Sequence, residues 1–175
     1  MDNRKNSVLI AEEAMPNGRV LVVDDKDISL CIAKGMLSLY GLLIDTAKSG
    51  HEAIEKIKYN VYDLVLMDHD HMMPRMNCIE TTREVRKLKG EYEKLPIVAL
   101  TVNTAAGKEM FLANGFNGFI SKPIVLQEID KMLKEWLSPK KIFQHADYRL
   151  KYLQSLTEER IELPTSCLEG NCSIH

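Results

Sequence analysis

The sequence lacks any long apolar run. No uninterrupted apolar stretch in its 175 residues approaches the roughly 18 residues of a membrane-spanning helix. The first segment, Met1 to Asn17, carries charges throughout and has no apolar core of the kind found in secretory signals. We therefore expect a cytoplasmic protein without direct membrane contact, although a longer parent protein could itself be anchored in a membrane.

An excess of basic charge is also absent, and cysteine is scarce. The chain has 23 Lys and Arg against 25 Asp and Glu, a formal net charge of −2. No basic surface is therefore expected to attract nucleic acid. Only Cys31, Cys78, Cys167 and Cys172 are present, and their spacing does not match that of paired zinc knuckles. We expect free thiols at Cys31 and Cys78 and no zinc site.

What the sequence does contain is a regular alternation of short apolar runs and amphipathic segments. The runs predict strands at 19–23, 42–46, 61–68, 96–101 and 118–121, and the segments predict helices from Asp27, from Ser49, at 77–89, 105–113 and 125–137. Such alternation is typical of βαβ units with right-handed crossovers. The predicted fold is α/β, a doubly wound five-stranded parallel sheet of flavodoxin-like order 2-1-3-4-5 with helices on both faces. In the first helix, Ile28, Ile32 and Leu39 fall on one face.

The same patterns predict the domain organisation. Residues 1–18 end in the turn signal Met-Pro-Asn-Gly and are expected to be a flexible N-terminal linker. Residues 19–138 form the main domain. Residues 139–162 are expected to be a helical C-terminal extension, and residues 163–175 a flexible tail.

Polar residues follow the predicted strands where each strand ends. The carboxyl ends of parallel strands meet at one edge of a sheet, so these side chains should converge. Several carboxylates together need a divalent cation, and an oxygen-only ligand set favours Mg²⁺. A carboxylate beside Mg²⁺ can attack a phosphoryl group, whose charge a lysine and a hydroxyl would stabilise. The residues concerned are Asp24, Asp25, Asp68, Asp70, Thr101 and Lys122.

Five short motifs carry a resemblance to a known family. Residues 20–25, 62–68, 73–74, 98–101 and 119–123 (Val-Leu-Val-Val-Asp-Asp, Tyr-Asp-Leu-Val-Leu-Met-Asp, Met-Pro, Val-Ala-Leu-Thr and Phe-Ile-Ser-Lys-Pro) together resemble the receiver domains of two-component response regulators. The resemblance covers roughly residues 19–138. Within that family, the sequence is most similar to receivers fused at the C-terminus of hybrid sensor histidine kinases.

The resemblance implies the ligands of the metal and the phosphoryl group. Asp25 would bind Mg²⁺ directly. Asp24 would contact the ion through a water molecule or would contact the residues that bind it. Lys122 would pair with the acceptor carboxylate and then with the phosphoryl group. The family motif also implies that the peptide between Lys122 and Pro123 is cis, which X–Pro bonds tolerate.

The resemblance also implies a switch and partners. Thr101 would be the switch hydroxyl, and Phe119 the aromatic residue that moves inward when Thr101 engages the phosphoryl group. The phosphoryl group would come from a histidine kinase or a histidine phosphotransfer domain in a phosphorelay. The face of the fourth helix, fifth strand and fifth helix would carry the output, including a homodimer.

Two aspartates compete for the acceptor position. In the family the acceptor precedes the Met-Pro proline by four residues, which fits Asp70, whereas the strand length counted from Asp63 fits Asp68. The chain reads as though a second His-Asp pair were inserted. We favour Asp68, because neighbours hold a central strand in register while a loop absorbs an insertion. Asp70 would then crowd or join the metal site, with its backbone carbonyl as a ligand.

The inserted pair leaves two other functions open. A degenerate receiver would act as an interaction module without phosphorylation, and Val102, standing where the family has a small residue, would also restrict access. A haloacid dehalogenase-like phosphatase would use Asp68-x-Asp70 as its signature, but that family places its signature first and its acidic pair last. His69 and His71 are expected to be solvated loop residues.

Overall fold

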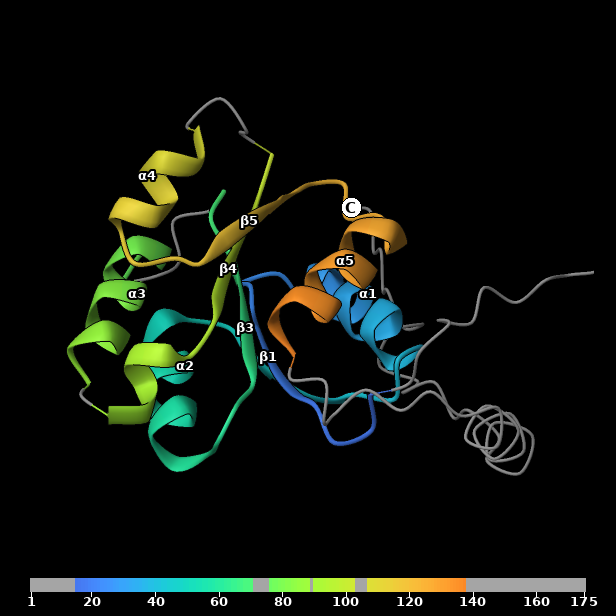
Figure 1. Ribbon diagram of the computed structural model, residues 1–175, viewed down its shortest axis with the longest axis horizontal. Coiled ribbons are helices and arrows are strands. Elements are labelled where there is room, and N and C mark those ends of the chain that lie inside the picture. The colour runs from blue at the N-terminus through green and yellow to red at the C-terminus, as the bar shows by residue number, and fades with distance from the viewer. Residues whose placement is uncertain (1–14, 71–75, 89, 103–106, 138–175) are drawn as a thin grey trace, which may run out of the picture. The chain divides into compact units, whose positions relative to one another are not determined.

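The computed structural model describes residues 15–70, 76–88, 90–102 and 107–137. Its sheet has five parallel strands in the order β2-β1-β3-β4-β5 (Figure 1), which confirms the predicted fold class and strand order. Each strand lies within two or three residues of its predicted bounds. The strands are β1 (Arg19–Val23), β2 (Leu43–Ala47), β3 (Leu64–Asp68), β4 (Ile97–Thr101) and β5 (Gly118–Ser121).

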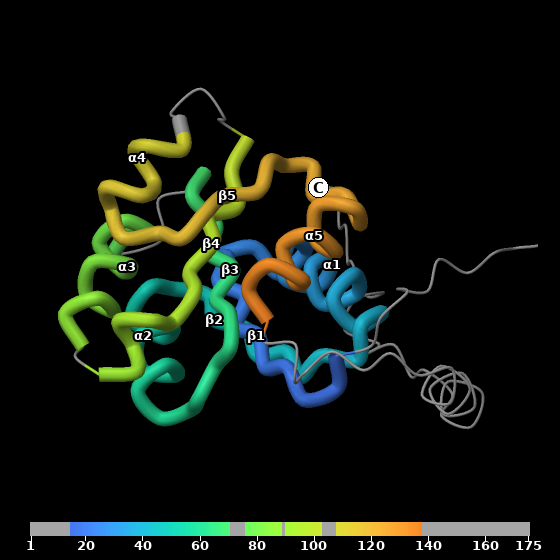
Figure 2. Tube along the Cα trace, in the orientation of Figure 1, coloured from blue at the N-terminus to red at the C-terminus, as the bar shows by residue number. Residues whose placement is uncertain are grey.

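Helices cover both faces of this sheet. One face carries α1 (Asp27–Ser38) and α5 (Leu126–Trp136). The other carries α2 (Gly50–Tyr59), α3 (Cys78–Lys87) and α4 (Gly107–Ala113), and Figures 1 and 2 show the two groups on opposite sides of the strands. A short 3₁₀ helix, η1 (Gly90–Lys94), precedes β4. The first two residues of the predicted 105–113 helix lie outside the described residues.

The strands are apolar on both sides because both faces are buried. Side chains alternate along a strand, so Val20 and Val22 of β1 join the core under α1 and α5, while Leu21 and Val23 join the core under α2, α3 and α4. Two separate cores therefore pack against the two faces of the sheet, and they hold the strand ends in fixed register.

The predicted face of the first helix is wrong in part. Ile28 and Ile32 are 73% and 57% exposed, whereas Leu30, Ala33 and Leu37 are buried. The buried set follows the i, i+3, i+7 spacing of a single stripe, and it packs against the core. An exposed apolar stripe therefore runs along α1.

The chain segment before β1 is anchored where it is described. Met15 is fully buried, and its N–H donates a hydrogen bond of 2.7 Å to the carbonyl of Tyr40. Met15 thus belongs to the core rather than to the predicted linker. The rest of that linker, residues 1–14, and the predictions for 139–162 and 163–175 lie outside the described residues. Among the helices that are described, none is both long and apolar enough to cross a membrane.

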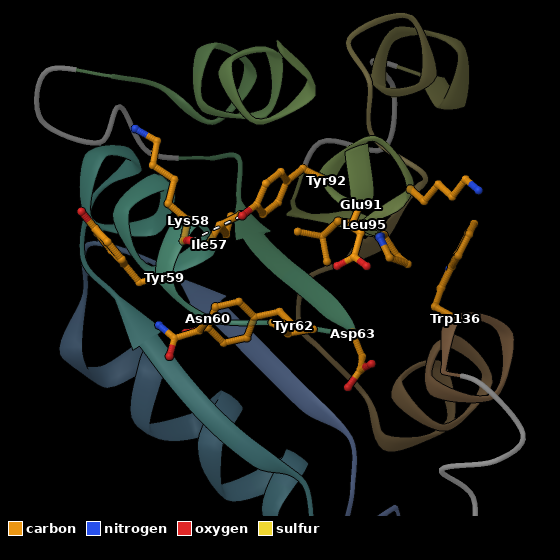
Figure 3. A pocket seen from close by; sticks show the side chains of 13 residues that line it. Ile57, Lys58, Tyr59, Asn60, Tyr62, Asp63, Glu91, Tyr92, Leu95 and Trp136 are labelled. Atoms are coloured by element: carbon orange, nitrogen blue, oxygen red, sulfur yellow. Dashed lines mark hydrogen bonds between the residues drawn. The ribbon is translucent and has the colours of Figure 1, made fainter. Parts of the chain in front are cut away.

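A cavity of about 470 Å³ opens at the amino-terminal edge of the sheet. Tyr62 and Asp63, which precede β3, line it together with Tyr92 and Trp136 (Figure 3). None of the predicted site residues lines this cavity. The candidate chemistry is instead collected at the opposite edge, where the strands end.

Candidate functional site

Backbone hydrogen bonds beyond the strand ends fix the acidic residues in place. After β1, the N–H of Asp24 donates to the carbonyl of Ala47 over 3.1 Å. The carboxylate of Asp24 then accepts from the N–H of Lys26 over 2.9 Å, which turns the chain into α1. Asp68 is the last residue of β3, and the next N–H still donates to β4. The two acidic strand ends are therefore held rigidly side by side.

Three carboxylates form one cluster. One oxygen from each of Asp24, Asp25 and Asp68 lies within 4.8 Å of the others. Burial raises the pKa of Asp24, and the charge of Asp68 raises it further. Among the described residues, Oδ1 of Asp25 is buried without a hydrogen-bond partner. A buried oxygen without a donor in an all-oxygen cluster fits a divalent cation.

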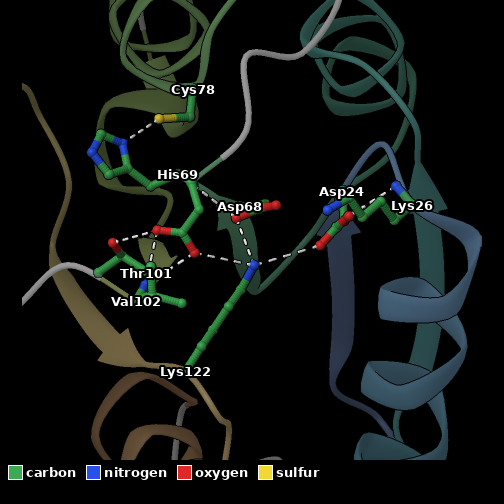
Figure 4. A network of polar contacts seen from close by, with 9 residues as sticks. Asp24, Lys26, Asp68, His69, Cys78, Thr101, Val102 and Lys122 are labelled. Atoms are coloured by element: carbon green, nitrogen blue, oxygen red, sulfur yellow. Dashed lines mark hydrogen bonds and ion pairs between the residues drawn. The ribbon is translucent and has the colours of Figure 1, made fainter.

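The ammonium group of Lys122 lies beside this cluster (Figure 4). Its Nζ is 2.7 Å from Oδ1 of Asp68, 3.4 Å from Asp70 and 3.8 Å from Asp24. Burial acts to lower the pKa of Lys122, but the hydrogen bond and charge of Asp68, with the other two carboxylates, raise it overall. The Lys122–Pro123 peptide is cis, as the resemblance implies. Lys122 therefore remains a cation aimed at Asp68.

Asp70 lies apart from the three-carboxylate cluster. Its Oδ1 accepts a hydrogen bond of 2.7 Å from the hydroxyl of Thr101 and one of 2.8 Å from the N–H of Val102. Its own N–H donates to Oδ1 of Asp68 over 3.0 Å. The cluster of candidate metal ligands therefore does not include the Asp70 carboxylate, for which the sequence left open whether it crowds or joins the metal site. Whether its carbonyl is a ligand stays a prediction.

The two predicted switch residues stand on neighbouring strands. Thr101 ends β4 and is fully buried, and it pairs with Ser121 of β5. Phe119, two residues earlier on β5, is half-buried, and its ring stacks on Phe111 of α4 with centroids 5.4 Å apart. The arrangement links the site to α4 through β5.

His69 is not the solvated loop residue expected from the sequence. Its Nδ1 lies 2.9 Å from Sγ of Cys78, and its ring meets Phe111 edge-on at 5.0 Å. Burial, with the charges of Asp68 and Asp70, raises the pKa of the Cys78 thiol to about 12. Strand parity could have revealed this contact, because a residue that follows Asp68 must point to the opposite face of the sheet.

Comparisons with known proteins agree on one family. The family model of the response regulator receiver domain matches residues 20–134. The chain is 33% identical over 162 residues to histidine kinase 5 of Arabidopsis thaliana, and 38% identical over 119 residues to the autoinducer 2 sensor kinase/phosphatase LuxQ of Vibrio vulnificus. These matches cover 78% and 66% of the chain but only 17% and 13% of the two relatives.

Solved structures give the same result. The chemotaxis protein CheY4 of Vibrio cholerae is 30% identical, with a TM-score of 0.62 over 69% of the chain and 98% of that protein. The receiver domain of a sensor histidine kinase from Pseudomonas aeruginosa is 28% identical, with a TM-score of 0.62 over 68% of the chain and 96% of that domain. A magnesium ion is coordinated in the active-site cleft of that second structure.

Proposed function

The chain belongs to the response regulator receiver domain family of two-component signalling, and we propose that it accepts a phosphoryl group on Asp68. The observation that carries the proposal is the 2.7 Å contact between Nζ of Lys122 and Oδ1 of Asp68, beside the cluster of Asp24, Asp25 and Asp68. Of the three described carboxylates that contact Lys122, Asp68 lies nearest to the ammonium and also belongs to the cluster. Family membership also argues against a haloacid dehalogenase-like phosphatase.

The contacts of Asp70 support Asp68 as the acceptor. The Asp70 carboxylate is 0.7 Å farther from Nζ of Lys122, 3.4 Å against 2.7 Å, and lies outside the three-carboxylate cluster. Asp68 is part of a strand that pairs on both sides, so its position does not depend on the loop that follows. The two extra residues therefore fall after the acceptor.

The reaction is the transfer of a phosphoryl group between two side chains. A carboxylate oxygen of Asp68 forms a bond to phosphorus as the P–N bond of a partner's phosphohistidine breaks. The imidazole leaves with the electron pair of that bond and takes up a proton. Lys122 stabilises the charge on the phosphoryl oxygens, and the hydroxyl of Thr101 donates to one of them once the group is attached.

Magnesium is the proposed cofactor. Asp25 and Asp68 would hold it, with Asp24 behind them, and the buried Oδ1 of Asp25 would find the partner it lacks among the described residues. When bound, the ion neutralises charge on the phosphoryl oxygens. The protein's own contribution is to hold the acceptor, Lys122 and Thr101 at fixed strand ends.

The output surface is proposed to be the face of α4, β5 and α5. Phe119 connects this face to the site through its stacking on Phe111 of α4. A hollow of about 410 Å³ on the same face is lined by Phe119 together with Lys108 and Lys131. We also propose that the chain forms a homodimer through this face. Comparing the sedimentation of the protein with and without beryllofluoride tests this proposal.

The phosphodonor is proposed to be a histidine kinase or a histidine phosphotransfer domain that docks on α1. A hollow of about 220 Å³ borders the site there, lined by Ile32 and Ile124 with Asp24 and Lys122 at its polar end. Ile28 and Ile32 add exposed apolar surface beside it. A partner that buries this stripe would bring its phosphohistidine to Asp68.

The acceptor is tested by incubating the protein with acetyl phosphate and Mg²⁺ and measuring intact mass. We expect the wild-type chain and Asp70→Asn to gain a phosphoryl group, and Asp68→Asn to gain none, because a carboxamide is not a nucleophile here. Labelling of Asp68→Asn together with loss of labelling in Asp70→Asn would make Asp70 the acceptor.

The docking face is tested with Ile32→Glu. Transfer from a phosphorylated histidine phosphotransfer domain should fall about tenfold or more, since a charge at the centre of an apolar contact is costly, while labelling by acetyl phosphate should not change. Val61→Glu is the matched control, because Val61 is 74% exposed at the opposite edge of the sheet. Equal loss of transfer in both variants would refute docking on α1.

A degenerate receiver is the second candidate, and one observation favours it. The side chain of Asp68 has no exposed surface, so no donor can reach it in this conformation. The acetyl phosphate experiment separates the two functions, because a degenerate receiver would remain unlabelled at every acceptor position.

A further inference from the structure

The side chain of Asp70 fills an anion-binding site that three other groups make. The hydroxyl of Thr101, the N–H of Val102 and the ammonium of Lys122 all point at its carboxylate, at 2.7, 2.8 and 3.4 Å. All three are cationic or donor groups, and only 10% of the Asp70 side chain is exposed. Such a set of donors would bind any compact anion placed there.

The site adjoins the proposed acceptor. The N–H of Asp70 donates to the same Oδ1 of Asp68 that receives Lys122. A phosphoryl group attached to Asp68 would place its oxygens within reach of Thr101 and Lys122, and these are the groups that Asp70 now engages. The Asp70 carboxylate and a phosphoryl group on Asp68 would therefore compete for the same donors.

We infer that Asp70 is an internal ligand of the phosphoryl-binding site: its carboxylate occupies the place of the phosphoryl oxygens, engages Thr101 before any phosphorylation, and must leave before Asp68 can be modified. This inference rests on the proposed function of Asp68. It explains why Asp68 is fully buried and why Thr101 already has a charged hydrogen-bond acceptor.

The inference predicts that removing the Asp70 carboxylate opens the site. The apparent affinity for an external anion falls with the fraction of molecules in which the site is free. A hydrogen bond to a charged group has a net value equivalent to a factor of about ten or more. Asp70→Ala should therefore bind beryllofluoride, in the presence of Mg²⁺, about tenfold more tightly than the wild-type chain, as measured by fluorine NMR.

Charge alone could raise the affinity, so the design separates charge from occupancy. Glu109→Gln is the matched control, because it removes one exposed negative charge, in the first turn of α4. Raising the ionic strength reduces the Debye length to a few ångströms and suppresses long-range repulsion. The gain from Asp70→Ala should persist in high salt and should be absent in Glu109→Gln.

A second readout needs neither magnesium nor an anion. In the wild-type chain alone, the Val102 amide proton is bonded to a carboxylate, so Asp70→Ala should move its resonance upfield and speed its exchange with solvent. Deletion of the pair Asp70-His71, which leaves the strand parity unchanged, should give the same shift and the same gain in beryllofluoride affinity.

The outcomes separate this inference from the proposed function. An unchanged Val102 amide in both variants, or an affinity gain that disappears in high salt, would overturn the occupancy of the site by Asp70. If the amide responds as expected but no variant binds beryllofluoride or accepts a phosphoryl group, the occupancy is supported and Asp68 is not an acceptor.

Discussion

Replacing Lys122 with methionine should destabilise the domain more than any exposed lysine replacement. The ammonium lies 2.7, 3.4 and 3.8 Å from Asp68, Asp70 and Asp24. At an effective dielectric constant of about 20, each attraction is roughly 4 to 6 kcal/mol before desolvation is subtracted. The carboxylates repel one another by comparable amounts, and Lys122 compensates part of this repulsion.

The net effect is smaller than the sum of those attractions, because the ammonium no longer has to be desolvated. Breaking a buried charge pair typically costs about 3 to 5 kcal/mol. We therefore expect Lys122→Met to lose about 3 to 5 kcal/mol of unfolding free energy in the presence of a chelator, measured by urea denaturation. Lys131→Met, which changes an exposed lysine of α5, should lose no more than about 0.5 kcal/mol.

Magnesium gives the same experiment a second arm. A cation at the carboxylate cluster stabilises the folded state by about 2.7 kcal/mol when its concentration is one hundred times its dissociation constant. Because Lys122→Met removes a repelling positive charge, magnesium should bind this variant more tightly than the wild-type chain and should recover a larger share of its stability. A loss below about 1 kcal/mol in chelator, or equal losses in the two lysine variants, would refute this account of the site.

Two further predictions concern parts of the fold that hold the site. Gly50→Ala should destabilise the domain by about 1 to 3 kcal/mol, because an added Cβ would collide with the hydroxyl of Thr81. Gly35→Ala, which has open space around it, should instead stabilise α1 by about 0.4 to 1 kcal/mol. Thermal unfolding of both variants tests this prediction, and a similar effect of the two substitutions would contradict it. At neutral pH, iodoacetamide should modify the exposed Cys31 far faster than Cys78, because burial raises the pKa of the Cys78 thiol to about 12 and leaves almost no thiolate. Peptide mass mapping measures both rates, and comparable rates would show that the thiol of Cys78 is accessible.

The strand order could be predicted from the sequence because its causes are local. Each strand is a short apolar run that ends at a polar residue, and right-handed crossovers leave few arrangements for five such units. The placement of Asp24, Asp25 and Lys122 at one edge follows from that order alone. To predict the contact between Lys122 and Asp68, the two inserted residues had in addition to be placed after β3. The pairing of β3 with strands on both sides favours that placement.

Other features depend on packing that the sequence does not state. The orientation of α1 could not be read from Ile28 and Ile32, because Leu30 and Leu37 form a second apolar stripe and only the core decides which one is buried. The position of the Asp70 carboxylate could not be predicted from the sequence either. Asp70 lies beyond the end of β3, where no strand register fixes its place.

The dipeptide at the end of β3 has a consequence for how such a site arises. Asp68-His69 is repeated at once as Asp70-His71, so an in-frame duplication of two codons is enough to create the second aspartate. Because two residues preserve the alternation of the strand, the sheet, the acidic cluster and Lys122 would be left as they were. A receiver with an open phosphoryl-binding site and one that supplies its own ligand are therefore separated by a single genetic event, and the reverse deletion would restore the open form in one step.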